Sequence, residues 1–473
     1  MAEKYEYDLL VIGSGPGGQK AAVQAAKLGK RVGLIDLNPT LGGVCLHDGT
    51  IPSKSFREAI LHLTGYRVRE RFGKAYRVKQ NILMEDLSLW SSGIIAEIEQ
   101  TLRAQMQRNH VQLIAGFGSF VDSHRIRVSH RNKSETLSAD KIVIATGTSP
   151  RRPEGFIFDD EVILDSNGVL YMENIPQSLA IVGGGVIGCE YGSMFAALGC
   201  KVTIIEAQPR ILGFLDREIV ETLSFHLREH RVQIRTSEKV VRCQRSSDGR
   251  AIIYLESGKR LVSDKLLVSA GRVGNTEKLG LERIGIKVDE RDLISVNDSF
   301  QTAAPNVYAV GDVIGFPALA STAMEQGRLA VLSAFGIEEN VPPQPFSYGI
   351  FTIPEIAAIG KTEEQLSADR VPYEIGTARF EEVERGMILG ISKGGLKLLF
   401  HRETRKILGI HIIGEGAIEM IHIGQCVIAM DGTLSNLVHM IFNYPTLSQA
   451  YKIAALDGIN KLMAMQGIEP DEI

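Results

Sequence analysis

The sequence predicts an α/β protein in which two Rossmann-like units precede a smaller α+β unit. A glycine-rich loop lies between an apolar run and a helix-like run near residue 13, and the same arrangement returns near residue 183. The last part of the chain has strand-like and helix-like runs but no such loop. A chain of 473 residues has room for about three domains of ordinary size.

The first Rossmann-like unit begins with an apolar, β-branched run over residues 7–12, which predicts a strand. Gly13, Gly15 and Gly18 follow it and open a run of Ala and Leu at helical spacing. In this GxGxxG pattern the three glycines permit a tight turn, a close approach to a pyrophosphate and close helix packing. Asp36 ends the next predicted strand, where a carboxylate can accept hydrogen bonds from ribose hydroxyls.

The second unit repeats this pattern 170 positions later, counted from the first glycine of each copy (13 and 183). Its glycines are Gly183, Gly185 and Gly188, and its acidic residue is Glu206. In both copies the acid lies 23 positions after the first glycine (13 to 36, 183 to 206). Two complete copies in the correct strand context predict that the protein binds two dinucleotides.

Each unit closes with an apolar run that enters a turn of small residues, at Gly147 in the first and Gly271 in the second. The first unit is longer, with 134 positions between its first glycine and this turn (13 to 147) against 88 in the second (183 to 271). The extra residues predict helices, one with an apolar stripe that we interpret as core or dimer packing. The stripe consists of Ile94, Ile95, Ile98, Leu102 and Met106.

These patterns predict three domains. The first is discontinuous, over residues 1–150 and 274–343, the second covers 151–273 and the third covers 344–473. A proline-rich stretch at 341–346 is typical of a linker into the third domain.

Composition excludes several classes of protein. The 52 Lys and Arg and 56 Asp and Glu give a net charge of -4 with no basic block, which argues against nucleic-acid binding. No apolar run is long enough to span a membrane, and the first residues lack the layout of a signal peptide. The five cysteines are scattered and form no CxxC pair, so we predict no metal site. We therefore expect a cytoplasmic protein without membrane or nucleic-acid partners.

Four stretches resemble the flavin-dependent disulfide reductases, the family of lipoamide dehydrogenase and its relatives. They are LGGVCLHDGTIPSK at 41–54, ATG at 145–147, VYAVGDV at 307–313 and FTIPEIAAIGKTEEQL at 351–366. The resemblance implies FAD on the first Rossmann-like unit and a nicotinamide dinucleotide on the second. It also implies a homodimer joined by the third domain and leaves a larger assembly open.

The resemblance implies roles for individual residues. Asp36 would lie at the adenosine ribose of FAD and Asp312 near its ribityl chain, while Lys54 and Glu190 would form a pair beside the flavin N5. There an ammonium can favour negative charge on the reduced ring. The other residues implied at the FAD site are Gly13, Gly15, Gly18, Gly43, Cys45, Thr146, Gly147 and Ala320, and those at the nicotinamide dinucleotide site are Gly183, Gly185, Gly188, Glu206 and Gly271.

The chain also departs from the disulfide reductases. Their redox loop carries two cysteines spaced CxxxxC, whereas here Cys45 is followed five positions later by Thr50. Their His and Glu acid/base pair near the carboxyl terminus is replaced by Tyr444 and Gln449. Without a dithiol or a thiol proton relay, hydride can enter the flavin from one nicotinamide, and its simplest exit is another nicotinamide.

With GTIPSK and NYPT as written here, the chain is similar to the soluble pyridine nucleotide transhydrogenases. This resemblance implies the reaction NADPH + NAD⁺ giving NADP⁺ + NADH through FAD, with NAD(H) and NADP(H) as substrates. Two alternatives stay open. One is an NADH oxidase or diaphorase that reduces oxygen or a quinone, and the other is a redox-sensing assembly protein that binds FAD and NADH.

Three residues have more than one interpretation. Glu206 suits the free 2′-hydroxyl of NAD(H) and would repel the 2′-phosphate of NADP(H), unless Arg210 reaches that phosphate. Val186 stands where some relatives place a gating aromatic residue, which favours an open nicotinamide shelf over simple packing. Cys45 is either a small loop residue against the flavin or a reactive thiolate that cycles through a sulfenic acid.

Overall fold

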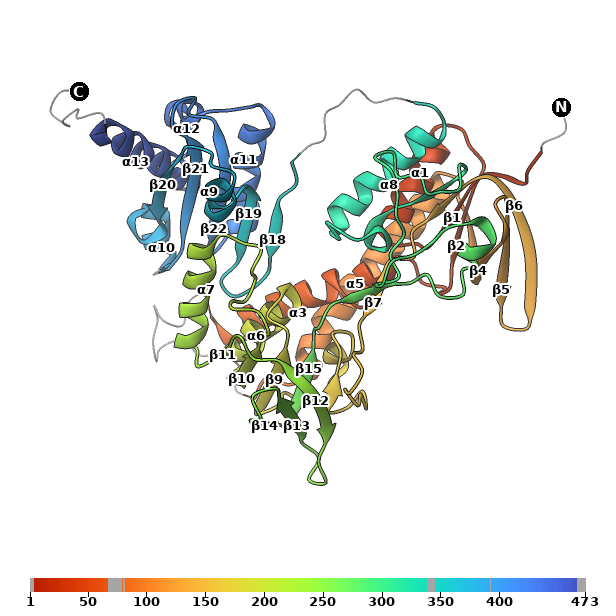
Figure 1. Ribbon diagram of the computed structural model, residues 1–473, viewed down its shortest axis with the longest axis horizontal. Helices are drawn as coiled ribbons and strands as arrows, with labels where there is room; N and C mark the ends of the chain where they lie inside the picture. The colour runs from red at the N-terminus through yellow and green to blue at the C-terminus, as the bar shows by residue number, and fades with distance from the viewer. Residues whose placement is uncertain (1–3, 67–78, 80, 338–344, 392, 466–473) are drawn as a thin grey trace.

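The computed structural model describes residues 4–66, 79, 81–337, 345–391 and 393–465 (Figure 1). Of the predicted linker, residues 341–344 lie outside these ranges, as does the predicted boundary at residue 343. The described residues form three main sheets, two with parallel strands and one antiparallel, so the predicted fold class is confirmed.

The first sheet has a parallel part in the order β3-β2-β1-β6, with β17 also on β6, and continues through β5 and β4 as an antiparallel meander. β17 comes from a part of the chain that follows the second sheet, so the chain returns to the first sheet. The strands are β1 (Tyr7–Ile12), β2 (Val32–Asp36), β3 (Gln112–Ala115), β4 (Phe117–Asp122), β5 (Arg125–His130), β6 (Lys133–Ile144) and β17 (Val307–Ala309).

Helices α1 (Pro16–Lys27) and α8 (Ala320–Ala334) pack beside this sheet (Figure 1). The predicted extra helices of the first unit are confirmed as α3 (Thr50–Thr64) and α5 (Met84–Arg108), preceded by the short α2 (Gly43–His47). In the apolar stripe on α5, Met106 is buried while the four residues nearer the start of the helix are half-buried.

The second sheet is wholly parallel, in the order β11-β10-β9-β15-β8, as its glycine fingerprint predicts. A three-stranded antiparallel sheet adjoins it, and a small ribbon of β7 with β16 lies where the chain leaves the first sheet and returns. The strands are β7 (Thr148–Pro150), β8 (Ile163–Leu164), β9 (Ser178–Val182), β10 (Lys201–Ile205), β11 (Gln233–Arg235), β12 (Val240–Arg245), β13 (Ala251–Leu255), β14 (Arg260–Ser263), β15 (Lys265–Val268) and β16 (Arg272–Gly274), and the helices are α6 (Val186–Ala197) and α7 (Arg217–Glu229).

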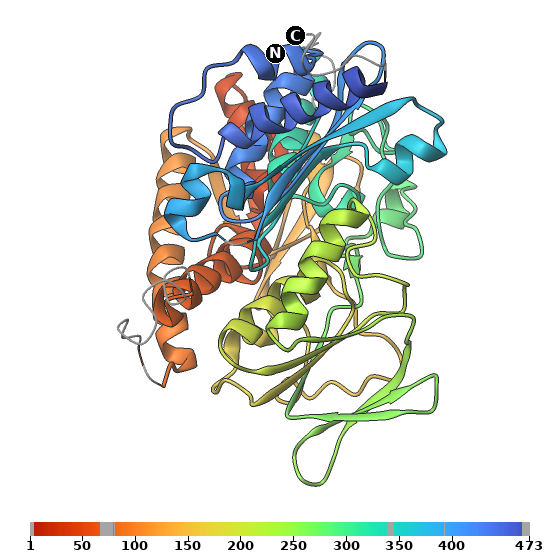
Figure 2. The ribbon, with the colours of Figure 1, turned by 90° about the vertical axis from the view of Figure 1, so that its left-hand side faces the viewer.

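The third sheet is antiparallel, in the order β18-β19-β22-β21-β20, and α11 and α13 cover it (Figures 1 and 2). Its elements are β18 (Tyr348–Ile350), β19 (Ile356–Gly360), α9 (Glu363–Ala368), β20 (Tyr373–Arg379), α10 (Glu384–Leu389), β21 (Gly395–His401), β22 (Ile407–Ile413), α11 (Ala417–Ala429), α12 (Leu434–His439) and α13 (Gln449–Met465). Short 3-10 turns complete the fold at η2 (Gly168–Tyr171), η3 (Leu281–Ile284), η4 (Gly311–Ile314) and η5 (Phe380–Glu382).

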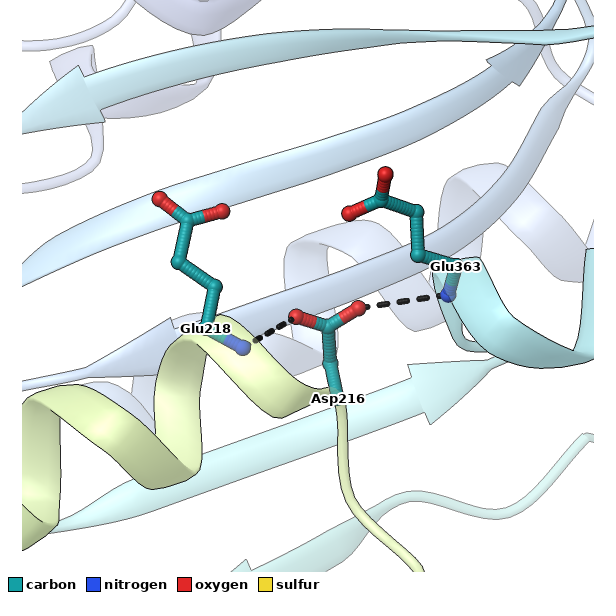
Figure 3. A group of neighbouring side chains, drawn as sticks. All are labelled: Asp216, Glu218 and Glu363. Atoms are coloured by element: carbon teal, nitrogen blue, oxygen red, sulfur yellow. Dashed lines mark hydrogen bonds between the residues drawn. The ribbon is translucent and has the colours of Figure 1, made fainter.

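A buried ion cluster joins α7 to the third sheet, against which α7 lies in both views (Figures 1 and 2). Asp216 is fully buried and accepts hydrogen bonds from the backbone N–H groups of Glu218 and Glu363, at 3.2 Å each (Figure 3). The Lys397 ammonium lies 3.0 Å from Asp216, 3.0 Å from Glu218 and 2.6 Å from Glu363. These three carboxylates could otherwise hold a metal ion, but here a lysine supplies the positive charge.

Helices α1 and α8 approach each other through glycines. A β-carbon on Gly327 would lie 2.1 Å from the carbonyl oxygen of Gly17, and one on Gly17 would lie 3.0 Å from the carbonyl oxygen of Ala323. Real β-carbons do not approach an oxygen as closely as 2.1 Å, so only glycine at residue 327 permits this crossing. The crossing in turn sets where α1 begins, beside the first glycine fingerprint.

We expect Gly327→Ala to lower the free energy of unfolding by about 1–3 kcal/mol, because overpacking must push α8 away from α1. Gly93→Ala on α5 is the matched control, because a β-carbon there meets no atom within 4 Å. A helical alanine should leave stability unchanged or raise it by up to about 1 kcal/mol. Thermal unfolding of the two variants checks this, and equal midpoints would contradict the role of the glycine crossing.

Candidate functional site

A cavity of about 1980 Å³ lies where loops of all three sheets meet. The residues predicted for the FAD site converge on it, although they come from distant parts of the chain. Its lining includes Gly13, Gly15, Asp36, Gly43, Cys45, Lys54, Thr146, Gly147, Val186, Glu190, Asp312 and Ala320. Gly18 lies behind the first fingerprint loop rather than in the lining.

The first fingerprint has the geometry that a dinucleotide pyrophosphate requires. Gly13 adopts a φ of +106°, and a β-carbon on Gly18 would lie 1.9 Å from the Gly13 carbonyl oxygen, so both positions need glycine. A β-carbon on Gly15 would meet no protein atom within 4 Å and would instead project into open space at the start of α1. A phosphate can therefore approach the backbone there, at the positive end of the helix.

Two further features of the cavity fit a bound dinucleotide. Both carboxylate oxygens of Asp36 are anchored, one by the N–H of Ser14 at 2.6 Å and the other by the N–H of Asn38 at 2.9 Å. The hydroxyl of Thr146 is buried in the cavity wall and has no hydrogen-bond partner in the protein. Since buried hydroxyls are nearly always satisfied, this one indicates a partner from within the cavity.

The second fingerprint repeats this geometry beside the cavity. A β-carbon on Gly188 would lie 1.9 Å from the Gly183 carbonyl oxygen, and one on Gly185 would meet nothing within 4 Å. The Glu206 carboxylate accepts hydrogen bonds from the N–H groups of Gly184 at 2.6 Å and Gln208 at 2.7 Å.

The second fingerprint borders the cavity through Val186 and Ile187, which lie between its second and third glycines. Among the residues that the structure describes, the cavity lining includes none of Gly183, Gly185, Gly188, Glu206 and Gly271.

Lys54 and Glu190 form an ion pair inside the cavity, 2.7 Å between Nζ and Oε2. Lys54 lies on α3 and Glu190 on α6, and their side chains are 23% and 5% exposed. The other oxygen of Glu190 accepts a hydrogen bond from the Phe351 N–H at 2.9 Å, and the Lys54 ammonium lies 4.8 Å from the centre of the Phe351 ring. The pair thus holds the Lys54 ammonium in place at the cavity wall.

The neighbourhood of Cys45 supplies no second thiol. Thr50 lies beside it, and burial raises the pKa of the Cys45 thiol despite the hydrogen bond with Thr50 and the charge of Lys54. A raised pKa is the opposite of what a stabilised thiolate needs, so the reactive-thiolate interpretation is disfavoured. Tyr444, in the place of the catalytic histidine, is 67% exposed and does not line the cavity of this chain.

Arg210 binds other residues of the protein instead of being free to bind the 2′-phosphate of NADP(H). Its guanidinium lies 2.6 Å from the Glu364 carboxylate and donates to the Gly213 carbonyl at 3.0 Å. Glu364 belongs to α9, so this ion pair crosses from the second sheet to the third.

Several residues that line the cavity were not predicted from the sequence. Arg272 donates to the hydroxyl and carbonyl of Thr148, at 2.8 and 2.6 Å. Its position directly after Gly271, the closing turn of the second unit, was an available signal. An aromatic cluster of Phe214, Phe316, Phe346 and Tyr348 also lines the cavity. These four come from three separate segments of the chain, so no local pattern predicts them together.

Within the described residues, no helix is both long and apolar enough to cross a membrane. Two family models match the chain, pyridine nucleotide-disulphide oxidoreductase over residues 7–327 and the dimerisation domain of that family over residues 346–455.

Curated relatives match along almost the whole chain. Soluble pyridine nucleotide transhydrogenase of Mycobacterium tuberculosis is 49% identical over 462 residues, covering 97% of this chain and 98% of its own. Soluble pyridine nucleotide transhydrogenase of Yersinia pestis is 44% identical over 467 residues, covering 98% of this chain and 100% of its own.

Solved structures agree with this match. LpdA from Mycobacterium tuberculosis has a TM-score of 0.87 at 28% identity, and the HOCl-induced flavoprotein disulfide reductase RclA from Escherichia coli has 0.85 at 27%. Each comparison covers 95% of this chain and 99% of the other. Sequence, fold and cavity thus agree that this chain belongs to the pyridine nucleotide-disulphide oxidoreductase family.

Proposed function

We propose that this protein is an FAD-dependent NAD(P) transhydrogenase, which catalyses NADPH + NAD⁺ giving NADP⁺ + NADH. The observation that carries the proposal is a cavity that keeps the Lys54–Glu190 pair while Cys45 has Thr50, not a second cysteine, beside it. The relatives at 44 and 49% identity that bear the name soluble pyridine nucleotide transhydrogenase support the same activity.

We assign FAD to the first domain, residues 1–150 and 274–343. The return of β17 to the first sheet and the packing of α8 on α1 support this discontinuous domain. Gly13, Gly15 and Gly18 would hold the pyrophosphate, and Asp36 the adenosine ribose. Gly43, Cys45, Thr146, Gly147, Asp312 and Ala320 would surround the rest of the cofactor, and the unpartnered Thr146 hydroxyl supports this fit.

Bound FAD would supply the chemistry of accepting a hydride from one nicotinamide and returning it to another. The chain contributes charge and position. The Lys54 ammonium, fixed by Glu190 and lying over the Phe351 ring, would stabilise negative charge that develops beside it. Because Glu190 is almost fully buried, it orients Lys54 without itself facing the solvent.

The second domain, residues 151–273, would bind both nicotinamide dinucleotides in turn. Gly183, Gly185, Gly188 and Gly271 would keep the backbone open to the pyrophosphate, and Glu206 would face the ribose. Glu206 is anchored by two backbone N–H groups, so it does not turn aside readily. We therefore expect the site to bind NAD(H) more tightly than NADP(H) while accepting both.

The third domain, residues 344–473, would join two copies into a homodimer, which the match of the dimerisation model supports. We also propose a cytoplasmic location. All five cysteines are free, as expected for a reducing compartment.

Transhydrogenation is tested by mixing the purified holoprotein anaerobically with NADPH and thio-NAD⁺, with no disulfide present. We expect rapid formation of reduced thionicotinamide, because the flavin has no thiol to which it can pass electrons. Lipoamide and glutathione disulfide should be reduced slowly or not at all. Transfer from NADH alone would instead identify an NADH-specific flavoprotein, and full flavin reduction without turnover on any acceptor would indicate a redox-sensing protein.

We expect Glu206→Gln to lower the KM for NADPH about tenfold with a smaller change for NADH, because removing one like charge beside the 2′-phosphate is worth roughly 1.4 kcal/mol or more. Steady-state kinetics with each donor measure this. Arg210→Gln is the control, since Glu364 already holds its guanidinium, and we expect its KM for NADPH to change less than about twofold. A large loss in the Arg210 variant would place that arginine at the phosphate after all.

A further inference from the structure

Residues 351–355, between β18 and β19, are hydrogen-bonded to helices on two sides. The Phe351 N–H donates to Glu190 at 2.9 Å, and the Ile353 N–H donates to the Ser193 hydroxyl at 3.0 Å, so α6 holds one side. On the α3 side, the Arg57 Nε donates to the Thr352 carbonyl oxygen at 3.2 Å. The segment therefore ties α3 to α6 near the Lys54–Glu190 pair.

Arg57 is the most deeply buried charged side chain in this region, at 2% exposure. Its guanidinium has three described partners: the Thr352 carbonyl, the Glu355 carboxylate at 3.2 Å and the Glu58 carboxylate at 2.7 Å. Two of these partners lie within residues 351–355. Because a guanidinium is a rigid planar fork, gripping a carbonyl and a carboxylate at once fixes the segment in both distance and orientation.

Arg57 lies three residues after Lys54, about one turn further along α3. The same helix therefore grips the segment through Arg57 and presents Lys54 to the Phe351 ring and to Glu190. Glu190 in turn is held by the Phe351 N–H. These contacts connect the three segments in a ring. Helix α3 binds residues 351–355, these residues bind α6, and the Lys54–Glu190 ion pair joins α6 to α3.

We propose that Arg57 is a positioning residue for hydride transfer, which acts by holding residues 351–355 so that Phe351 and Glu190 fix the Lys54 ammonium at the cavity. This inference rests on the proposed function, because it assumes that Lys54 stabilises charge on the bound flavin. A merely structural arginine would contribute to folding without affecting the reactivity of the folded protein. Buried ion pairs are often dispensable for stability, so a separate role has physical grounds.

The test uses the double variant Arg57→Met/Glu355→Gln, which keeps the side-chain volume and leaves neither partner of this pair as an unpaired charge. The measurement is the anaerobic rate at which NADH reduces the bound flavin. Misplacing a catalytic group by 1 Å can cost roughly a hundredfold in rate. Because Arg57 acts on Lys54 only through residues 351–355, we expect a smaller loss, of about tenfold. The visible absorption spectrum of the bound flavin should change in the same direction as in Lys54→Met, and Arg57→Lys should recover part of the rate.

A double-mutant cycle separates positioning from general destabilisation. If Arg57 acts through Lys54, adding Arg57→Met/Glu355→Gln to Lys54→Met should slow flavin reduction no further, although thermal stability still falls. Lys397→Met/Asp216→Asn is the matched control, because it removes an equally buried cation together with its buried carboxylate partner at the other contact with the third sheet. Its effect on the rate should multiply with that of Lys54→Met.

A rate within about twofold of the wild type in the Arg57 variant, or losses that multiply with Lys54→Met, would overturn the proposal. Flavin reduction by NADH needs no second nicotinamide. The rate of flavin reduction can therefore still be measured if the protein does not catalyse transhydrogenation. The positioning role of Arg57 and the transhydrogenase activity are thus tested independently.

Discussion

The Lys54–Glu190 ion pair is the contact on which the active-site geometry depends. It joins α3, which belongs to the extra helices of the first unit, to α6, which opens the second Rossmann-like unit. A carboxylate as buried as Glu190 needs a cation and a hydrogen-bond donor, and these come from Lys54 and the backbone of Phe351. The pair thus brings elements of all three sheets to one wall of the cavity and holds the Lys54 ammonium there.

What the cavity lacks is as informative as what it contains. A disulfide reductase needs a second thiol next to the first, and Thr50 stands beside Cys45 instead. Burial also raises the pKa of the Cys45 thiol, which disfavours the thiolate that a reactive cysteine needs. Hydride chemistry needs only a held charge, a cofactor cavity and a dinucleotide surface, and the chain keeps all three. The same scaffold therefore serves nicotinamide exchange once the thiol route is removed.

The sequence predicted the features that depend on local spacing. The two glycine fingerprints and their acids follow from steric limits at Gly18 and Gly188 that hold wherever the pattern occurs, and both copies have the same geometry. Lys54 and Glu190 are 136 positions apart and no periodicity links them. Only the resemblance therefore predicted that they are partners. The resemblance singled out residues 351–366, but the contacts of Arg57 with this segment were not predicted, since they join residues 295 positions apart. The pairing of Arg210 with Glu364 was missed for the same reason.

The number of electrons that the site can store shows directly whether FAD is its only redox carrier. Purified holoprotein is titrated anaerobically with dithionite while the visible absorption of the flavin is followed. A site whose only redox carrier is FAD should be fully reduced by one pair of electrons per flavin. Uptake of two pairs per flavin would reveal a second carrier such as a redox-active thiol pair, and would contradict an account in which hydride leaves only through a nicotinamide.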